Sequence, residues 1–391
     1  MSTTAPSSTA VEARLAQHAD AIDEQTAHDA SLARRARPRR FDDCVGQELA
    51  ARMLRTVAAA HTPHHAYLLV GPRGTGKTTM ARVFAAALNC PDAEAGEPCG
   101  TCRSCEAIAR GADLDVVEID AASHNKVEDA RDLTGKVIMS AVGGRFRVFI
   151  LDEAHMLTTQ AWNALLKTLE EPPPRTVFIL ATTEAGKVLP TVEDRCHRIN
   201  FRRPSLGVLS ARIETIAQTE GITIDRDACM VAARYAQGSY RRALGALEQI
   251  VVGTPAEQPI TGSLSSQILG TVDAKTSGDL FGAIVTGQQL VALQIVAEAI
   301  AAGTEPDAIL RDLERHSREV LICCTAQIVP ETLVQNAEHA HQLSQQASTV
   351  TAAHCVAVID RIAGGLRAIS DGADARVQLE VVAVDGLSGR R

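Results

Sequence analysis

A glycine-rich stretch carries the clearest chemistry in this sequence: Gly71-Pro72-Arg73-Gly74-Thr75-Gly76-Lys77-Thr78-Thr79. An apolar run at 66–70 precedes it, and apolar residues at helical spacing follow it from Met80 to Leu88. This order predicts a P-loop, because glycines let backbone amides face phosphate oxygens while the helix N-terminus adds partial positive charge. We expect Lys77 to contact the β- and γ-phosphates of a nucleotide and Thr78 to bind Mg²⁺, with the other residues from Gly71 to Thr79 around the phosphates.

Two acidic residues, Asp152 and Glu153, end a second apolar run at 147–151. In an open parallel sheet, ligands bind at the edge formed by the carboxyl ends of the strands. We therefore expect Asp152 to complete the Mg²⁺ shell and Glu153 to polarise the water that attacks the γ-phosphate. An isolated Asp-Glu pair can also cap a helix. The P-loop upstream favours the catalytic interpretation.

Two further positions are ambiguous on residue type alone. Thr182 and Thr183 follow the apolar run at 177–181, where a hydroxyl can sense a γ-phosphate. Threonine at a strand end is also explained by β-propensity. Arg195 lies a few residues later, and a single arginine in such a place is usually a surface charge.

Four cysteines follow the P-loop helix at the spacing Cys90-x8-Cys99-x2-Cys102-x2-Cys105, among proline, glycine and acidic residues. Four thiolates at this spacing can close a tetrahedral Zn²⁺ site with no position left for water, so we predict a structural zinc module at 90–105. Ordinary buried cysteines are the alternative, but the polar surroundings do not resemble a core. The remaining cysteines are predicted to be small core residues: Cys44, Cys196, Cys229, Cys323, Cys324 and Cys355. The later histidines show no ligand-like grouping and are interpreted as ordinary surface or core residues: His316, His339, His341 and His354.

The composition is that of a globular chain rather than a disordered one. Its 391 residues are 46% hydrophobic and carry a formal net charge of −8. Any contact with DNA must therefore come from a local basic surface or from backbone amides rather than from a general positive field. The sequence has no 18-residue apolar run and no secretory h-region, and its cysteine usage fits a reducing cytoplasm, so we expect a cytoplasmic protein without a membrane partner.

The order of the predicted elements indicates an α/β fold that is followed by helical domains. Strands are expected at 66–70, 115–119, 147–151 and 177–181, with helices between them. The basic segment 34–40 is either a solvated linker or a set of arginines that face phosphate. The expected domains are a disordered or partly helical tail at 1–35, a nucleotide domain at 36–203, a small helical domain at 204–253, a linker at 254–265 and a helical domain at 266–391.

These motifs together resemble the gamma/tau subunit of the bacterial DNA polymerase III clamp loader, an AAA+ ATPase. The resemblance is carried by the P-loop, by the cysteine loop inserted after its helix, and by three further stretches: Asp120-Ala-Ala-Ser-His-Asn-Lys-Val-Glu-Asp129, Leu151-Asp-Glu-Ala-His-Met156 and Asn163-Ala-Leu-Leu-Lys-Thr-Leu-Glu-Glu-Pro-Pro173. It implies an AAA+ domain with a parallel sheet and an inserted zinc loop, then a helical lid and an all-α collar that mediates oligomerisation.

The resemblance also implies roles for single residues. Thr182 or Thr183 matches sensor 1, with Thr183 preferred, and Arg241 matches sensor 2. Arg195 matches an arginine finger that reaches the ATP of a neighbouring subunit, and Val45 lies where the family packs the adenine. The implied cofactors are ATP, Mg²⁺ and structural Zn²⁺. The implied partners are the delta and delta-prime subunits, further copies of this chain, the sliding clamp and primer-template DNA.

Three departures from the family pattern stand out. Asp194 replaces a serine before Arg195, where its carboxylate could pair with the finger. Arg242 replaces an aspartate after Arg241, and Ala36 replaces an aromatic residue or lysine before Arg37. The sequence ends after the predicted collar, as in the short gamma form, and it shows no polymerase carboxylates of its own, although the family belongs to the DNA-directed DNA polymerase holoenzyme. The alternatives are a largely non-catalytic delta-prime subunit and a replication-fork AAA+ remodeller that does not load clamps.

Overall fold

The computed structural model describes residues 31–124, 127–137, 141, 143–255, 258–272, 274–330, 333–334 and 337–385. The chain forms two compact units, one of residues 31–208 with 238–242 and one of residues 209–237 with 243–385. Most of the predicted tail at 1–35, and Asn125 and Lys126 of the family motif, lie outside the described residues. Residues Leu32–Arg35 form a short helix, α2, whose Leu32 is buried.

The first unit is built on a parallel sheet of five strands in the order β2-β3-β4-β1-β5. The strands are β1 (Ala66–Val70), β2 (Val116–Asp120), β3 (Arg147–Asp152), β4 (Thr176–Thr182) and β5 (His197–Asn200). The predicted parallel α/β fold is confirmed. β5 is the strand that the apolar pattern did not predict, because three of its four residues are polar and exposed and only Ile199 is buried.

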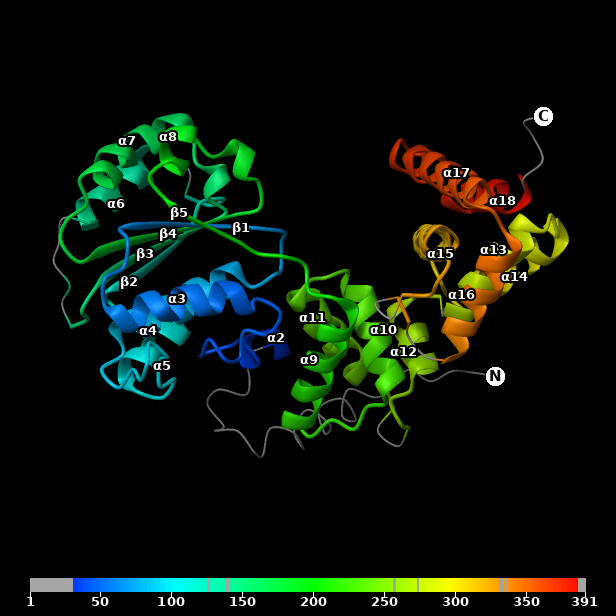
Figure 1. The fold of residues 1–391 in the computed structure, drawn as a ribbon, viewed down its shortest axis with the longest axis horizontal. Helices are drawn as coiled ribbons and strands as arrows, with labels where there is room; N and C mark the ends of the chain where they lie inside the picture. The colour runs from blue at the N-terminus through cyan, green and yellow to red at the C-terminus, as the bar shows by residue number, and fades with distance from the viewer. Residues whose placement is uncertain are drawn as a thin grey trace. The chain divides into compact units, whose positions relative to one another are not determined.

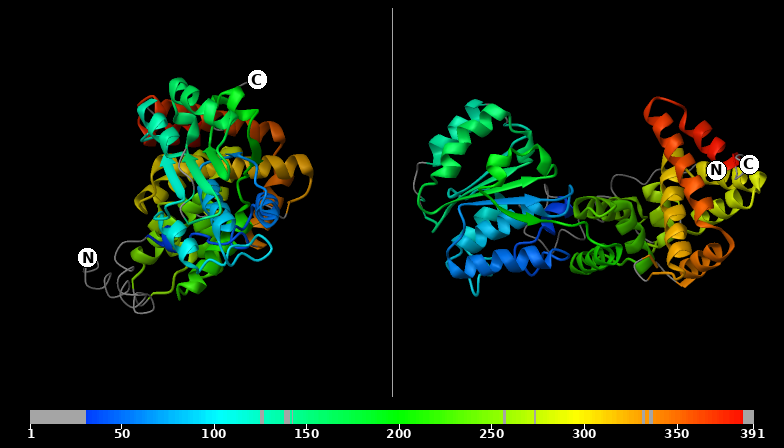
Figure 2. Two further views of the ribbon diagram at one scale, coloured as in Figure 1. Left: turned by 90° about the vertical axis from the view of Figure 1, so that its left-hand side faces the viewer. Right: turned by 45° about the horizontal axis from the view of Figure 1, so that its top comes forward.

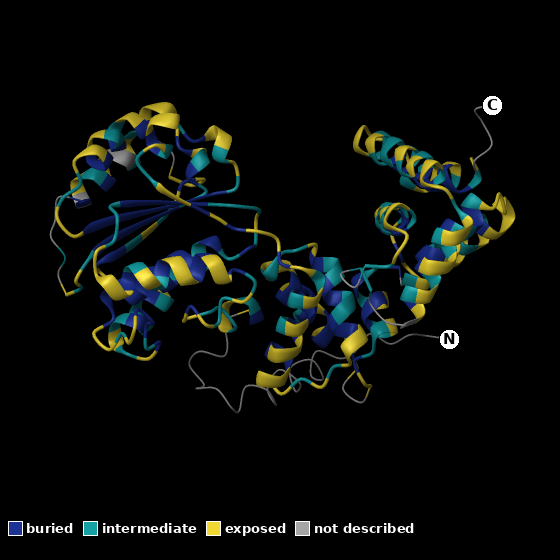
Figure 3. Ribbon diagram, viewed as in Figure 1, coloured by how far each residue is buried: buried dark blue, intermediate teal, exposed yellow. Residues whose placement is uncertain are grey.

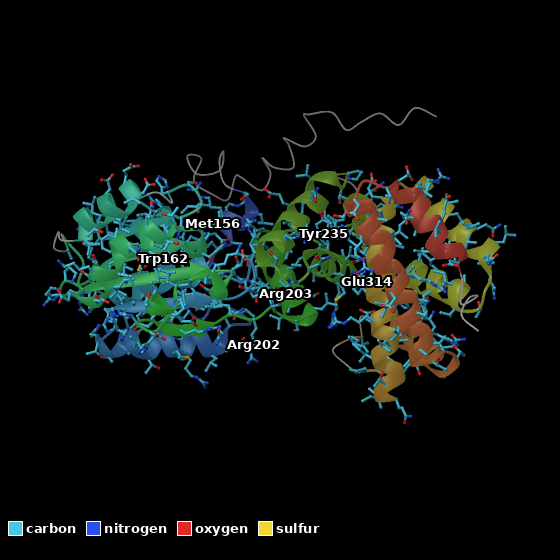
Figure 4. The ribbon with its side chains drawn as sticks, turned by 90° about the horizontal axis from the view of Figure 1, so that it is seen from above. Met156, Trp162, Arg202, Arg203, Tyr235 and Glu314 are labelled. Carbon is cyan, nitrogen blue, oxygen red and sulfur yellow. The ribbon has the colours of Figure 1, made fainter. Side chains whose placement is uncertain are left out.

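Both faces of this sheet are covered by helices, because alternate residues of each strand point to opposite sides. Tyr67 and Leu69 of β1 pack in the same core as α3 (Glu48–Ala60), α4 (Lys77–Asn89) and α5 (Arg103–Arg110). Ala66 and Leu68 pack instead with α6 (Val127–Val137), α7 (Thr159–Glu170) and α8 (Pro190–Glu193). Figure 1 shows the two helical layers, Figure 2 shows them from other sides, and Figure 3 shows the buried strands between them. Figure 4 looks onto the α6–α8 face, where the buried Trp162 lies over the sheet.

The second unit is helical throughout its described residues, apart from one isolated bridge between Ile224 and Ile260. Its first helices, two of which share residues with the first unit, are α9 (Leu206–Thr219), α10 (Arg226–Ala236) and α11 (Tyr240–Gly253). α12 (Gly262–Leu269) begins inside the segment that was expected as a linker and packs against α10. A larger core joins α13 (Ala274–Val285), α14 (Gln289–Ala301), α15 (Pro306–Ala326), α16 (Ala337–Thr349), α17 (Ala352–Ser370) and α18 (Ala375–Val384).

Among the described residues, no single helix is long and apolar enough to cross a membrane. The consecutive segments Glu338–Thr349 and Ala352–Ser370 together have the length and composition of a membrane span, but they are bent by 109°. Cys355, Val358 and Ile362 of α17 are buried in the core of the helical unit, as expected for a core helix of a globular domain.

Candidate nucleotide site and cysteine cluster

The P-loop turns between β1 and α4 through two glycines with positive φ, Gly74 at 77° and Gly76 at 98°. Residues with a Cβ rarely adopt these angles. A Cβ at Gly74 would also lie 2.0 Å from Oγ of Ser239, so another element passes directly over the loop. A Cβ at Gly76 would meet no atom within 4 Å, which leaves open space beside the first residue of α4. Conformation and space together fit a loop that wraps an anion.

Lys77 is the first residue of α4, and only 6% of it is exposed. Its Nζ donates hydrogen bonds to the carbonyl oxygens of Gly71 at 2.8 Å and Pro72 at 3.0 Å. Burial lowers the pKa of Lys77, the charges of Glu153 and Asp152 oppose this shift, and Arg241 and Arg73 add to it. A buried ammonium group at the mouth of a loop of amides is well placed to pair with a phosphate.

The two halves of the predicted magnesium site meet. The hydroxyl of Thr78 donates a hydrogen bond of 2.7 Å to Oδ2 of Asp152, which lies at the carboxyl end of β3. Hydroxyl and carboxylate oxygens are the kind of ligand that Mg²⁺ takes next to a bound phosphate. The residues present therefore fit a magnesium nucleotide.

Glu153 is the next residue after Asp152, and its backbone adopts the left-handed conformation with φ at 48°. The hydroxyl of Thr183 donates to Oε2 of Glu153 at 3.2 Å. Thr182 is fully buried and hydrogen-bonded instead to His155, whose Nδ1 lies 3.1 Å from its hydroxyl. Thr183 is thus the threonine whose hydroxyl reaches the candidate catalytic carboxylate, and its role as a sensor stays a prediction.

His155 is a functional candidate that reasoning from the sequence missed. Its ring lies between two carboxylates, with Nδ1 at 3.5 Å from Oε2 of Glu153 and Nε2 at 3.4 Å from Oε1 of Glu184. The ring is buried, so its position restricts where the Glu153 side chain can go. The available signal was its place two residues after Glu153, in a motif that was used only for the resemblance.

The start of α11 lies on the P-loop within the first unit. The backbone amide of Tyr240 donates to the carbonyl of Gly74 at 2.9 Å, and its hydroxyl donates to the carbonyl of Val45 at 2.5 Å. These bonds bring Val45 and Arg241, the predicted adenine contact and sensor 2, to the same site. The effect of Arg241 on the pKa of Lys77 reflects that proximity.

Arg195 is not brought to this site. It follows α8, with its side chain about one-third exposed, and it donates to the carbonyl of Thr191 and to Oε1 of Glu170 at 2.7 Å. Glu170 rather than Asp194 is its ion-pair partner among the described residues, although the sequence had suggested Asp194. Glu170 lies on another helix, and nothing in the local sequence pointed to it.

Only part of the basic segment is shielded by the nucleotide domain: Arg37 is half-buried, whereas Arg34, Arg35, Arg39 and Arg40 are exposed. Arg34, Arg37 and Arg39 line a small pocket together with Arg82 of α4 and residues of α5. Burial lowers the pKa of Arg37, with a further contribution from Arg82. Arg82 is itself held by Glu118, at 2.5 Å between Nε and Oε2.

The four predicted ligand cysteines form one cluster, with all four sulfurs within 4.8 Å of one another. The Sγ atoms of Cys90 and Cys102 are 3.8 Å apart, and those of Cys99 and Cys105 are 4.0 Å apart. These separations are too long for disulfides and match the edge of about 3.8 Å expected for a tetrahedron with Zn–S bonds of about 2.3 Å. Burial raises the pKa of Cys90 and Cys105, whereas the amide of Thr101 lowers the pKa of Cys99 to about 6. The cluster has the geometry to hold a metal ion, which would stabilise the thiolate form of its buried members.

Comparisons with known proteins agree with these motifs. Residues 46–205 match the family described as DNA polymerase III, delta subunit, and residues 262–384 match DNA polymerase III subunits gamma and tau domain III. DNA polymerase III subunit gamma/tau of Mycobacterium tuberculosis is 35% identical over 359 residues, which cover 90% of this chain and 61% of the relative. Subunit tau of Escherichia coli is 39% identical over 282 residues, which cover 72% of this chain and 44% of the relative.

The chain belongs to the DNA polymerase III gamma/tau family. The resemblance inferred from the motifs is thus confirmed. The chain spans between 44% and 61% of the length of these curated gamma/tau relatives. Among solved structures, Thermotoga maritima RuvB is 19% identical with a TM-score of 0.45, and the match covers 64% of this chain and 79% of that one. A Bacillus subtilis DNA clamp loader delta protein is 14% identical with a TM-score of 0.38, and the match covers 85% of this chain and 98% of that one.

Proposed function

We propose that this chain is an ATP-hydrolysing motor subunit of a DNA polymerase III clamp loader, which places the sliding clamp on primed DNA during replication. Family membership supports the proposal. The observation that carries it is the junction of Thr78 with Asp152 at 2.7 Å, because it joins the phosphate loop to the acidic strand end. A P-loop without those acids would bind a nucleotide but would lack the means to hydrolyse it.

In this proposal each residue has a defined task. The loop amides and Lys77 hold the phosphates, and Thr78 and Asp152 hold Mg²⁺, which when bound neutralises charge that develops on the phosphoryl oxygens. Glu153 orients the attacking water and accepts its proton. Thr183 and His155 act through Glu153, because their contacts at 3.2 Å and 3.5 Å fix its carboxylate. Arg241 couples the start of α11 to the nucleotide, and Val45 contacts the adenine.

Arg195 completes the site of a neighbouring subunit. Its side chain after α8 is partly exposed and bonds to Thr191 and Glu170 rather than to a P-loop residue, which supports a role in trans. In the isolated chain Glu170 holds the guanidinium, and a γ-phosphate across a subunit boundary would compete for it. The proposed partners are further copies of this chain, delta and delta-prime subunits, the sliding clamp and primer-template DNA, all in the cytoplasm.

The function is tested with a loader reconstituted from this chain, its delta and delta-prime partners and its clamp. ATP turnover should rise when clamp and primed DNA are added together, and clamps should become trapped on circular primed DNA. A complex that hydrolyses ATP at the same rate with and without clamp and DNA would contradict clamp loading. A chain that neither hydrolyses ATP nor binds these partners would favour an unrelated remodeller.

The role of Arg195 gives a sharp prediction. Arg195→Ala should leave ATP affinity within about twofold but lower kcat of the reconstituted loader by about 10³, the effect of losing an arginine finger. Arg198→Ala is a matched control, because Arg198 is a nearby surface arginine paired with Glu193. Asp194→Ser should change little, since Glu170 is the partner of Arg195. Single-turnover hydrolysis checks all three variants, and an unchanged rate for Arg195→Ala would remove the role in trans.

We further propose that the cysteine cluster holds structural Zn²⁺. Cys102→Ser should weaken the sulfur-to-metal absorption of the cobalt-substituted protein, because one of four thiolate ligands is lost. It should also lower the thermal stability, because α5 starts at the cluster and adds few apolar contacts of its own. Cys44→Ser is the control, since that thiol lies outside the cluster. A wild-type protein that shows no thiolate–cobalt band in reduced, chelator-free buffer would refute the assignment.

A further inference from the structure

A second group of metal-ligand side chains lies in the helical unit. His316 and Glu319 come from α15, which is located in Figure 4 by Glu314, and His339 comes from α16. One ligand atom from each residue lies within 4.8 Å of the others. The sequence-based expectation that these histidines are ungrouped is therefore wrong for His316 and His339. It failed because more than twenty residues separate the two along the chain.

The cluster is buried. His316 is 2% exposed and His339 is 3% exposed, and the Glu319 side chain is exposed by 13%. A carboxylate and two imidazoles in such a place need a positive charge among them, because burying an uncompensated carboxylate is costly. Arg315 is close, but its guanidinium pairs with Asp312. A protonated histidine would balance the carboxylate, and a divalent cation would do so while leaving both imidazoles neutral, the form in which histidine binds metals.

The spacing of the His339–Glu319 pair fits coordination. Nε2 of His339 lies 3.4 Å from Oε2 of Glu319, which is longer than a typical hydrogen bond of about 2.7–3.2 Å. It matches the edge of about 3.3 Å expected for tetrahedral ligands with bonds of about 2.0–2.1 Å to zinc. The cysteine cluster meets the same criterion with its longer Zn–S bonds, as described above.

An outer partner fixes the tautomer of His316. The amide nitrogen of Gln346 donates to the carbonyl of Gly278 at 2.7 Å, so the amide oxygen of Gln346 faces His316, 2.6 Å from its Nε2. Nε2 must then carry the hydrogen, and Nδ1 carries the lone pair. Metal-binding histidines commonly donate their second ring N–H to an oxygen in this way.

We propose that His316, Glu319 and His339 bind a divalent transition-metal ion of the zinc class and that this ion links α15 to α16. Two imidazoles and one carboxylate are ligands that zinc accepts, with a water or another side chain in the fourth position. The i, i+3 pair on one helix and a third ligand from a facing helix are an arrangement that helical bundles use for metals. The role is structural, since the site is buried and distant in sequence from the P-loop.

Cobalt titration of the full metal-free chain tests this site apart from the cysteine cluster. We expect two Co²⁺ per chain at saturation, of which only one gives sulfur-to-metal absorption. Glu319→Gln and His339→Ala should each bind one Co²⁺ and keep that absorption unchanged. His341→Ala is the matched control on the same helix, because His341 is exposed and outside the cluster, and it should still bind two.

The melting temperature provides the second readout. Zn²⁺ added in excess of the cysteine sites should raise the melting temperature of the wild-type chain and of His341→Ala but not that of Glu319→Gln. Glu319→Gln preserves the shape of the side chain, so it remains informative if His339→Ala fails to fold. A wild-type stoichiometry of one Co²⁺, or a Glu319→Gln variant that still binds two, would overturn the proposal. Neither result depends on ATP hydrolysis, so failure here leaves the motor function untouched.

Discussion

Lys77→Ala is expected to abolish ATP binding at concentrations that saturate the wild-type chain. A lysine that contacts two phosphates makes charge-assisted hydrogen bonds of about 1.5–3 kcal/mol each. Their loss amounts to at least about 3 kcal/mol, which is more than a hundredfold in Kd. Isothermal titration with ATP measures the effect directly. Lys187→Ala is the matched control, because that lysine is exposed and pairs with Glu184 outside the P-loop.

The same variant should not unfold the ligand-free chain. Burial lowers the pKa of Lys77, so the folded state binds fewer protons than the unfolded state. The lowered pKa reduces the free energy of unfolding at every pH below the pKa of Lys77 in the folded state. The reduction becomes smaller as the pH rises from that pKa toward the pKa of the unfolded state. Removing the ammonium removes that reduction, along with the hydrogen bonds to Gly71 and Pro72. The melting temperature without ATP should therefore change little, whereas its increase on ATP addition should vanish. Wild-type affinity in Lys77→Ala would show that the phosphates bind elsewhere.

The sequence predicted the elements that depend on local pattern. β1, β3 and β4 were visible because buried parallel strands are continuous apolar runs, and the P-loop glycines are required by its backbone angles. β2, a partly exposed edge strand, was visible from its two valines and its isoleucine. β5 was not visible, since three of its four residues are exposed at the sheet edge. The Thr78–Asp152 junction was expected only because both residues end or follow strands that share one sheet edge.

Contacts between distant segments could not be read from the sequence. Glu170 holds Arg195 from another helix, and Asp194, the neighbour in sequence, does not. His316 and His339 looked isolated because their partner helices meet only in the folded chain. Side-chain pairs of this kind are set by packing, and a period of 3.6 residues identifies a buried face but not the element that covers it.

Glu153→Gln is expected to bind ATP as tightly as the wild-type chain and to lose hydrolysis by about 10²–10⁴ in kcat, the usual contribution of a general base. The substitution removes the base but keeps the shape, and the amide oxygen of glutamine can still accept the hydrogen bond from Thr183 that Glu153 accepts at 3.2 Å. The loader should therefore assemble, load ATP and accumulate in its clamp-bound state. Glu184→Gln is the matched control, because it changes the other carboxylate beside His155 and should lower kcat far less.

Single-turnover hydrolysis with bound ATP separates chemistry from binding. If Glu153→Gln kept a wild-type rate, another group would activate the water, and the assignment of Glu153 as general base would be wrong. If the variant lost ATP affinity instead, Glu153 would act in nucleotide binding, and the separate roles proposed for Asp152 and Glu153 would be wrong.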